Sequence, residues 1–355
     1  SMEGGRYSVS GLTATVFGCG GFLGRYVVNK LARVGTAVVV PHRFDCEDDQ
    51  RHLKLMGDLG MIVDVPWDAR DLDTIRHAVE KSDVVINLVG KHQNTMNYTF
   101  FASHVETASN IAKVCKEVGV PHFVQVSALA ADANSDSEWL RTKAWGEEEV
   151  KSYYPNATIV RPSVVFGEED RFINLIAAWT KIAGMVPLIG NGDNKIAPVY
   201  CDDVAEGIRT IVFDKDLHGR TYEFAGPEVY TTREVCRFVQ ETIWMENSTV
   251  RGVPDLSASL PQSMQGFSPH KLVGAFADIA YRGWAEVLPG FPQLLGARGD
   301  YAALNSADWV PHKAYLQLDD IGIDPQSIKV IGPELLRHYQ EGGHFSRINI
   351  EEDKQ

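Results

Sequence analysis

Short apolar runs of strand length alternate with longer segments of helical period along the first half of the chain. The strand-length runs are Thr13–Phe17, Ala37–Val40, Met61–Val65, Asp83–Val89, His122–Ser127 and Ala157–Arg161, and the helical segments include Phe22–Val34, Leu72–Glu80 and Ala102–Glu117. The runs Val84–Val89 and Phe123–Val126 are apolar on both faces, as expected of strands that helices cover on both sides of the sheet. Strands alternating with helices predict an α/β fold with a doubly wound parallel sheet.

The alternation weakens after about Gly167, where proline and glycine become frequent. These residues are Pro187, Gly190, Gly192, Pro198, Gly226 and Pro227. We therefore predict a nucleotide-binding domain over residues 1–167, to which strands and helices from about 195–230 return. Residues 168–355 are predicted to form mainly a smaller, interleaved C-terminal lobe and a tail.

Composition and charge exclude several classes of protein. The chain has 355 residues, of which 44% are hydrophobic and 23% are charged, which suits a large packed core and excludes a disordered chain. Its 34 Lys and Arg against 47 Asp and Glu leave a formal charge of -13. Nucleic-acid binding needs a basic footprint, so we expect no nucleic-acid partner.

The cysteines and the apolar runs indicate the redox compartment and exclude further kinds of site. Five widely spaced cysteines without a CxxC pair indicate neither a disulfide framework nor a zinc site, and they suit a reducing compartment. The sequence shows neither the HExxH of zinc proteases nor a GxSxG nucleophile elbow. No run approaches the roughly 20 apolar residues of a membrane span. We expect a soluble or peripheral protein without a metal site.

A glycine-rich sequence stands between the first predicted strand and the first predicted helix. Gly18 would allow a tight turn, Gly21 would let the backbone approach a pyrophosphate, and Gly24 would let helix and strand pack closely. Because the sequence follows a strand and opens a helix, we predict a dinucleotide-binding loop rather than a structural turn without a ligand. Its predicted cofactor-binding residues are Gly18, Gly20, Gly21, Phe22, Leu23 and Gly24.

The GxxGxxG spacing of this loop resembles that of the extended short-chain dehydrogenase/reductase superfamily, which implies a Rossmann fold. In such folds an acid after the second strand binds the ribose hydroxyls of NAD, whereas an arginine accommodates the extra phosphate of NADP. Arg43 follows the strand Ala37–Val40 and favours NADPH as the cofactor. Asp45 leaves an NAD-type site open, and a solvated loop residue is the other interpretation of Arg43.

Two further segments fit the same cofactor. Asp68 follows the third predicted strand, where extended members of the superfamily carry an aspartate that resembles an acceptor for the adenine amine. Leu88, Val89 and Gly90 end the fourth strand, where small residues let the backbone pass under the cofactor. Ordinary loop chemistry is the alternative for each segment.

The catalytic residues of the superfamily are incomplete in this chain. Short-chain reductases use a Ser with a Tyr and a Lys in a YxxxK turn, in which the phenol passes the proton. Here Ser127 ends the fifth strand and Lys143 is the correctly placed lysine, but Trp139 holds the tyrosine position. An indole N–H has no acid–base chemistry near neutral pH, so no catalytic residue is predicted. Pro162 and Val164 resemble the segment that faces the nicotinamide, with a plain strand exit as the alternative.

Within the superfamily, several motifs closely resemble the family of NADPH-binding accessory subunits of mitochondrial respiratory complex I. They include Gly21-Phe22-Leu23-Gly24-Arg25-Tyr26, Met56-Gly57-Asp58-Leu59-Gly60, Trp67-Asp68-Ala69-Arg70-Asp71, Glu169-Asp170-Arg171-Phe172 and Leu318-Asp319-Asp320-Ile321-Gly322. The resemblance implies a non-catalytic subunit that holds NADPH tightly and supports assembly and stability. It also implies a peripheral place on the matrix side of the mitochondrial inner membrane, near the junction of the peripheral and membrane arms, with other complex I subunits as partners.

Two interpretations remain open at this stage. The alternative to a structural subunit is a free-standing NADP-dependent reductase or epimerase, and Trp139 is the sequence feature that separates the two. The aromatic-rich segment Met264–Leu295 is either core of the smaller lobe or a surface that faces a partner protein or membrane lipids.

Overall fold

The computed structural model describes residues 10–43, 48–92, 94–95, 97–189, 192–244, 249–253 and 307–340. Seven parallel strands form a central sheet in the order β11-β6-β5-β4-β1-β2-β3. Their bounds are β1 Thr13–Phe17, β2 Ala37–His42, β3 Ile62–Pro66, β4 Val84–Asn87, β5 His122–Val126, β6 Thr158–Pro162 and β11 Thr221–Phe224. The predicted doubly wound α/β fold is confirmed.

Strand positions agree with the hydrophobic pattern to within a few residues. β1 has the predicted bounds, whereas β2 extends past Val40 to His42. The extension has a local reason. Pro41 pairs with Val65 of β3, beyond the last β1–β2 pair at Val39, so its missing N–H removes no hydrogen bond to β1.

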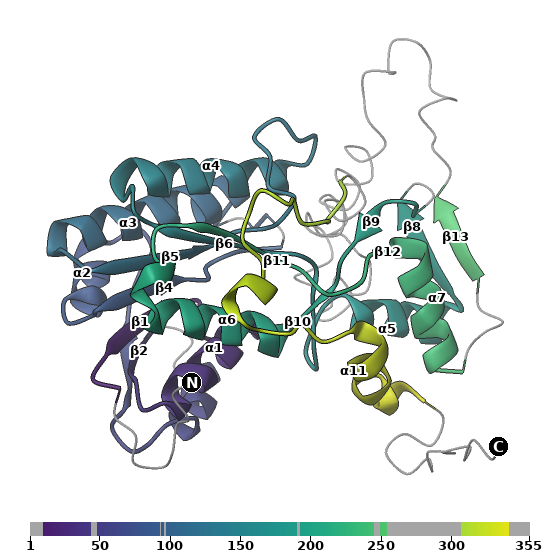
Figure 1. Cartoon of the computed structure of the whole chain (residues 1–355), viewed down its shortest axis with the longest axis horizontal. Coiled ribbons are helices and arrows are strands. Elements are labelled where there is room, and N and C mark those ends of the chain that lie inside the picture. Colours follow the sequence, from purple (N-terminus) through teal and green to yellow (C-terminus); the bar gives the residue numbers. More distant parts are fainter. Residues whose placement is uncertain are drawn as a thin grey trace.

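Helices cover both faces of the sheet (Figure 1). One face carries α2 Leu72–Val79, α3 Thr107–Val118 and α4 Glu138–Tyr153, and the other carries α1 Phe22–Arg33 and α6 Cys201–Phe213. Leu31 of α1 and Ile208 of α6 are fully buried in the same cluster. Each such side chain contributes about 1.5–3 kcal/mol by leaving water. This burial holds α1, and therefore the glycine loop at its N-terminus, against the sheet.

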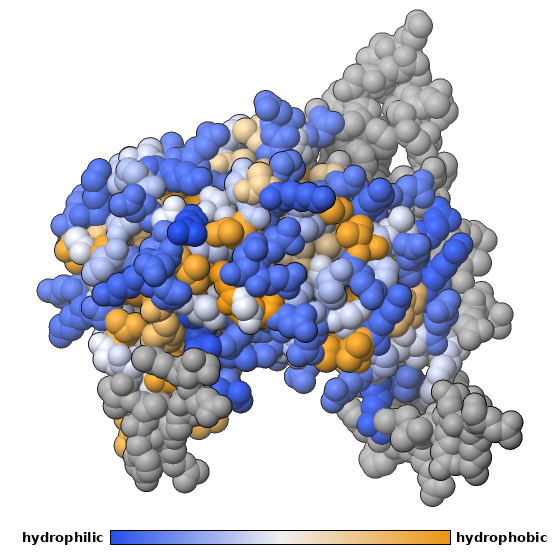
Figure 2. Space-filling model, viewed as in Figure 1, coloured by the Kyte–Doolittle hydropathy of each residue, from blue (hydrophilic) through white to orange (hydrophobic). Residues whose placement is uncertain are grey.

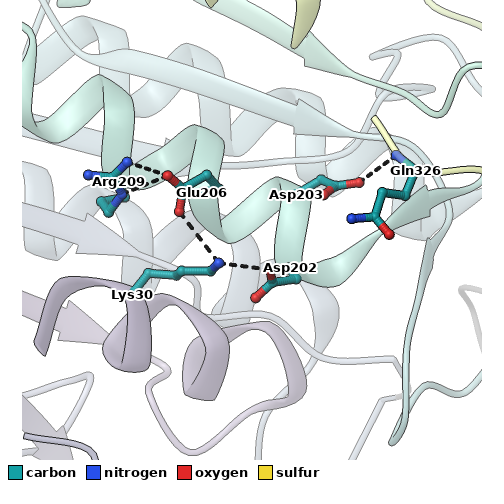
Figure 3. Close-up of polar contacts among 6 residues, drawn as sticks. All are labelled: Lys30, Asp202, Asp203, Glu206, Arg209 and Gln326. Atoms are coloured by element: carbon teal, nitrogen blue, oxygen red, sulfur yellow. Dashed lines mark hydrogen bonds and ion pairs between the residues drawn. The ribbon is translucent and has the colours of Figure 1, made fainter. Parts of the chain in front are cut away.

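Ion pairs also join α1 to α6 (Figure 3). Lys30 Nζ lies 2.7 Å from Asp202 Oδ2 and 3.5 Å from Glu206 Oε2, and Glu206 also pairs with Arg209. Lys30 is half-buried, so these contacts are less screened than surface pairs. They add to the apolar contact that positions the helix.

A second group of elements packs beside the carboxyl ends of the strands. It contains α5 Ile173–Ala183, α7 Thr232–Thr242, α11 Ile328–Leu335 and the paired strands β7 Val165–Phe166 with β10 Val199–Tyr200, β8 Met185–Ile189 with β13 Thr249–Val253, and β9 Lys195–Ile196 with β12 Tyr230–Thr231. Its buried cluster includes Trp309 and also Trp139 of α4. The two groups therefore share a core, and the domain boundary at residue 167 stays a prediction.

Several predicted features lie outside the described residues. They are Asp45, Cys46 and the segment Met264–Leu295. The other four cysteines are buried free thiols. In the described ranges, no helix is long and apolar enough to cross a membrane, and no group of His, Cys, Asp or Glu side chains could hold a metal ion. Figure 2 shows hydrophilic residues over most of the visible described surface, with hydrophobic residues in small groups between them.

Candidate functional site

The glycine loop packs tightly against the end of β4. Gly18 has φ +83°, a left-handed conformation that favours glycine. A Cβ on Gly18 would lie 2.9 Å from the carbonyl carbon of Leu88 and 3.1 Å from Val89 N, and a Cβ on Gly24 would lie 2.3 Å from Gly18 O. Both positions require glycine, in agreement with the turn and the close packing expected from the sequence.

The same loop leaves an exposed cradle at the start of α1. Gly20 and Gly21 are exposed, and Gly21 is the N-cap, where it has no side chain to occupy the helix end. The first-turn amides of Phe22, Leu23 and Gly24 have no acceptor within the helix, and the first turn contains no acid. The helix dipole adds positive potential there. This geometry suits a phosphate or pyrophosphate.

Polar residues follow β2 and β3 on the adjacent part of the sheet. Arg43 is exposed directly after β2. Asp68 follows β3, and its Oδ1 accepts hydrogen bonds from Arg70 N at 2.8 Å and from the Tyr98 hydroxyl at 3.4 Å. The Arg70 guanidinium also lies 4.5 Å from the centre of the Tyr98 ring. Sequence reasoning missed Tyr98, because nothing local connects it with Asp68.

Ser127, Gly90 and Lys143 form the other end of the site. Lys143 Nζ would lie 3.2 Å from a Cβ on Gly90. Burial lowers the pKa of Lys143 to about 8, against an opposing effect of Glu147. Ser127 Oγ is buried and has no hydrogen-bond partner in the described part of the chain. Buried hydroxyls normally find a partner, so this oxygen marks a place where a ligand group can bind.

Trp139 fills the place where a catalytic tyrosine would stand. It is 8% exposed, and its Nε1 donates to the carbonyl oxygen of Lys91 at 2.8 Å. Its ring centre lies 6.1 Å from that of Trp309 and 5.6 Å from Lys143 Nζ. His104 packs edge-on against the same indole and accepts a hydrogen bond from Lys91 N at 3.1 Å. The indole is therefore part of the core that joins the two groups of elements.

The end of β6 borders the same region. Pro162 is buried and its carbonyl accepts from Leu129 N at 2.9 Å, while Val164 is half-buried against the cluster that contains Trp139. These contacts are structural, and neither tests a role in cofactor binding.

An ion pair that sequence reasoning missed holds α4 at this position. Arg161 of β6 lies 2.7 Å from Glu147 of α4 and 3.6 Å from Glu223 of β11. Its guanidinium makes three hydrogen bonds to the Glu147 carboxylate. Glu147 and Arg161 are 14 residues apart, one on a helix and one on a strand, so no local spacing signals the pair. The pair thereby positions the helix that carries Trp139 and Lys143.

The predicted residues thus gather at one edge of the sheet. The loop after β1 and the end of β4 are in direct contact, Gly90 and Lys143 are neighbours, and Arg43 and Asp68 lie at the ends of adjacent strands. Carboxyl ends of parallel strands are the usual place for a ligand in open α/β sheets.

Comparison with known proteins agrees with this geometry. Residues 14–225 match the NAD dependent epimerase/dehydratase family. Among solved structures, the chain is similar to the dTDP-glucose 4,6-dehydratase of Streptomyces venezuelae with NAD bound, with a TM-score of 0.58 and 20% identity over 68% of this chain and 84% of that chain. It is also similar to a nucleoside-diphosphate-sugar epimerase from Staphylococcus aureus, with a TM-score of 0.62 and 16% identity over 92% of this chain and 100% of that chain. At these identities the likeness shows the fold.

Sequence relatives are more similar. The chain is 39% identical to NADH dehydrogenase (ubiquinone) 1 alpha subcomplex subunit 9, mitochondrial, from Arabidopsis thaliana, over 96% of this chain and 81% of that protein. It is 48% identical to the Mus musculus protein of that name over 67% of this chain, and 42% identical to the Neurospora crassa NADH-ubiquinone oxidoreductase 40 kDa subunit, mitochondrial, over 68% of this chain. Each of the last two matches spans 63% of the relative's length. The chain therefore belongs to the NAD dependent epimerase/dehydratase family and, within it, to the family of NADH dehydrogenase 1 alpha subcomplex subunit 9 proteins.

Proposed function

We propose that this chain is an accessory subunit of mitochondrial NADH:ubiquinone oxidoreductase (complex I) that binds NADPH and does not turn it over. The observation that carries the non-catalytic part is the environment of Trp139, whose only N–H is already donated to Lys91 O. The names of the relatives support the place in complex I.

The residues present fit a dinucleotide. The glycine loop offers the backbone amides of Gly20, Phe22, Leu23 and Gly24 to a pyrophosphate. Gly21 N donates to Gly18 O at 3.0 Å, so Gly21 would act by leaving room for the ligand. Substitution of Gly18 would disturb this cradle, since a Cβ there would meet Leu88 and Val89. Residues larger than glycine would therefore not fit at Gly18 or Gly24 without a change in the loop.

Other residues extend the same site to the two ends of the cofactor. Arg43 would pair with the phosphate on the adenosine ribose, and Asp68 would accept from the adenine amine. Ser127 and Lys143 would hydrogen-bond the nicotinamide end, beside Gly90, Pro162 and Val164. The unpartnered Ser127 Oγ supports this assignment.

Nicotinamide supplies hydride chemistry when it is bound, but a carbonyl acceptor also needs a proton. A tyrosine four residues before the lysine would supply that proton. Trp139 occupies this position and packs against Trp309, so an apolar ring takes the place of the acid. Lys143 then serves affinity rather than catalysis.

The same proposal includes location and partners. We place the subunit peripherally on the matrix side of the mitochondrial inner membrane, among other complex I subunits near the junction of the two arms, where it supports assembly and stability. Membrane lipids are a further candidate partner.

One experiment tests the place in complex I. Mitochondrial membranes from the source are solubilised in mild detergent, and the native size of the protein is measured by gel electrophoresis with NADH dehydrogenase activity staining. We expect the protein to migrate with the active complex. Migration near its own mass of 39.3 kDa or a small multiple would favour the free-standing reductase or epimerase.

A further inference from the structure

Described residues after β4 lie on both sides of the nucleotide-binding edge of the sheet. Lys91 follows the end of β4, whereas Asn97 O accepts a hydrogen bond from Arg70 Nη2 at 2.6 Å in the loop after β3. The next residue, Tyr98, donates to Asp68 at 3.4 Å. In the sheet, β1 and β2 lie between β4 and β3. Lys91 and Tyr98 therefore lie on opposite sides of the carboxyl ends of β1 and β2, where the glycine loop and Arg43 stand.

Positive side chains gather around Tyr98. Lys91 Nζ lies 5.0 Å and the Arg70 guanidinium carbon 4.5 Å from the centre of its ring. Lys91 Nζ donates to Thr95 Oγ1 at 2.8 Å. Burial and the nearby charge of Arg43 together lower the pKa of Lys91. Arg43 follows β2, whose last residue His42 accepts a hydrogen bond from Trp67 N at 2.8 Å, so Arg43 lies beside the loop that carries Asp68 and Arg70.

Lys91 and Arg70 have little local charge compensation in the part of the chain that the structure describes. None of the ion pairs between described residues involves Lys91 or Arg70. Asp68 is the carboxylate that touches the group, and its Oδ1 already accepts from Arg70 N and Tyr98. Lys91 is half-buried, whereas Arg70 and Arg43 are exposed. An anion bound between like charges offsets their repulsion.

The backbone of Lys91 is held from both sides. Its N–H donates to His104 Nε2 at 3.1 Å, and its carbonyl accepts from Trp139 Nε1 at 2.8 Å. Both partners are buried. The backbone of Lys91 is thus fixed before any ligand binds, so less conformational entropy is lost when its side chain binds an anion.

We propose that Lys91, with Arg70, binds the 2′-phosphate of NADP(H) together with Arg43, and that Lys91 is a specificity-determining residue for NADP(H) over NAD(H). This inference rests on the proposed nucleotide-binding function. A dianionic phosphate next to Arg43 would neutralise the cations around Tyr98, whereas NAD(H) has a neutral hydroxyl at this place. Trp139 and His104 act as positioning residues, since they hold the Lys91 backbone.

The test measures dissociation constants of NADPH and NADH by nucleotide fluorescence on the purified full chain. Lys91→Met should weaken NADPH by about tenfold or more, since it removes a charge-assisted contact, and leave NADH within about twofold. Lys91→Arg should retain most of the NADPH preference. Lys113→Met, an exposed lysine on α3, is the matched control and should change neither constant.

The outcomes separate this inference from the function on which it rests. Equal weakening of NADPH and NADH by Lys91→Met would overturn it, because the lysine would then contact the pyrophosphate that both share. It would also be overturned if Arg43→Met reduced the NADPH preference and Lys91→Met did not, although the nucleotide site would stand. A wild-type chain that binds neither nucleotide would refute the proposed function and the inference together. Thermal melting of each variant establishes that it is folded.

Discussion

The indole Nε1 of Trp139 donates a hydrogen bond to the carbonyl oxygen of Lys91 at 2.8 Å. The bond joins α4, which carries Lys143, to the residues that directly follow β4. An indole has a single donor, so Trp139 has no second proton to offer a bound substrate. Trp139 stands at the position of the catalytic tyrosine of short-chain reductases, and its N–H makes a structural hydrogen bond instead.

Reversing the charge of Arg43 should remove NADPH from the purified protein. In Arg43→Glu a carboxylate would stand where we place the 2′-phosphate, and the lost contact of ~1.5–3 kcal/mol should weaken NADPH by tens-fold or more. Extraction and chromatography of the bound nucleotide measure the effect. A wild-type protein that carries NAD, or no nucleotide, would contradict the prediction.

The bound NADPH should not be oxidised by carbonyl or quinone acceptors. Trp139 has committed its N–H to Lys91 and packs against Trp309, so no proton donor stands beside the nicotinamide site at this position. Single-turnover absorbance of the bound nicotinamide with a panel of acceptors provides the measurement, and free NADPH gives the background rate. Steady turnover above that background would refute the non-catalytic assignment.

Gly21→Leu should release the nucleotide and lower the melting temperature of the nucleotide-loaded protein. A Cβ at this exposed position would lie 3.2 Å from Gly18 O, a contact that a small shift can relieve, so the main effect is a block of the pyrophosphate. Loss of a ligand at one hundred times its Kd removes about 2.7 kcal/mol of stability. Differential scanning fluorimetry with and without NADPH measures it.

The apoprotein form of this variant provides the control. Without NADPH, Gly21→Leu should melt close to the wild-type apoprotein. By contrast, Gly24→Ala should destabilise both forms, because its Cβ would lie 2.3 Å from Gly18 O. A Gly21→Leu protein that loses nucleotide and yet melts like the loaded wild type would show that NADPH does not stabilise the fold.

Lys143 should make the apoprotein more stable as pH rises from about 8 toward 10.5. Burial lowers the pKa of Lys143 from 10.5 to about 8 in the folded state. Between these values the unfolded chain binds more protons than the folded one, so the free energy of unfolding increases with pH. Urea unfolding across this range should show a positive contribution that Lys143→Met lacks. Equal pH dependence in the two proteins would contradict the lowered pKa.

Removing the Arg161 partner should destabilise the fold. Glu147→Gln leaves a partly buried guanidinium with Glu223 at 3.6 Å as its remaining acid. Breaking a buried pair costs 3–5 kcal/mol, and the remaining acid reduces this to roughly 2–4 kcal/mol. Urea denaturation measures the change, with the exposed neighbour Glu148→Gln as control. A loss no larger than that of the control would show that the pair contributes little.

Much of the fold could be predicted from local pattern. β1 has the bounds that its apolar run predicts, and α1 ends one residue before the predicted end. Period-two and period-3.6 patterns are properties of neighbouring residues, so a single sequence displays them. The need for glycine at Gly18 and Gly24 could also be predicted, because strand, loop and helix are contiguous there.

Only the tertiary structure decided which residues far apart in the sequence form hydrogen bonds and ion pairs with one another. Trp139 and Lys91 are 48 residues apart, and their hydrogen bond exists because the order of β4 and β5 in the sheet brings the end of β4 beside α4. Arg161 meets Glu147 and Glu223 because β6 lies next to β11 and beneath α4. Sequence alone determined that Trp139 replaces the tyrosine that serves as proton donor in short-chain reductases. Only the fold showed what its indole binds, since strand order places long-range partners that no local pattern encodes.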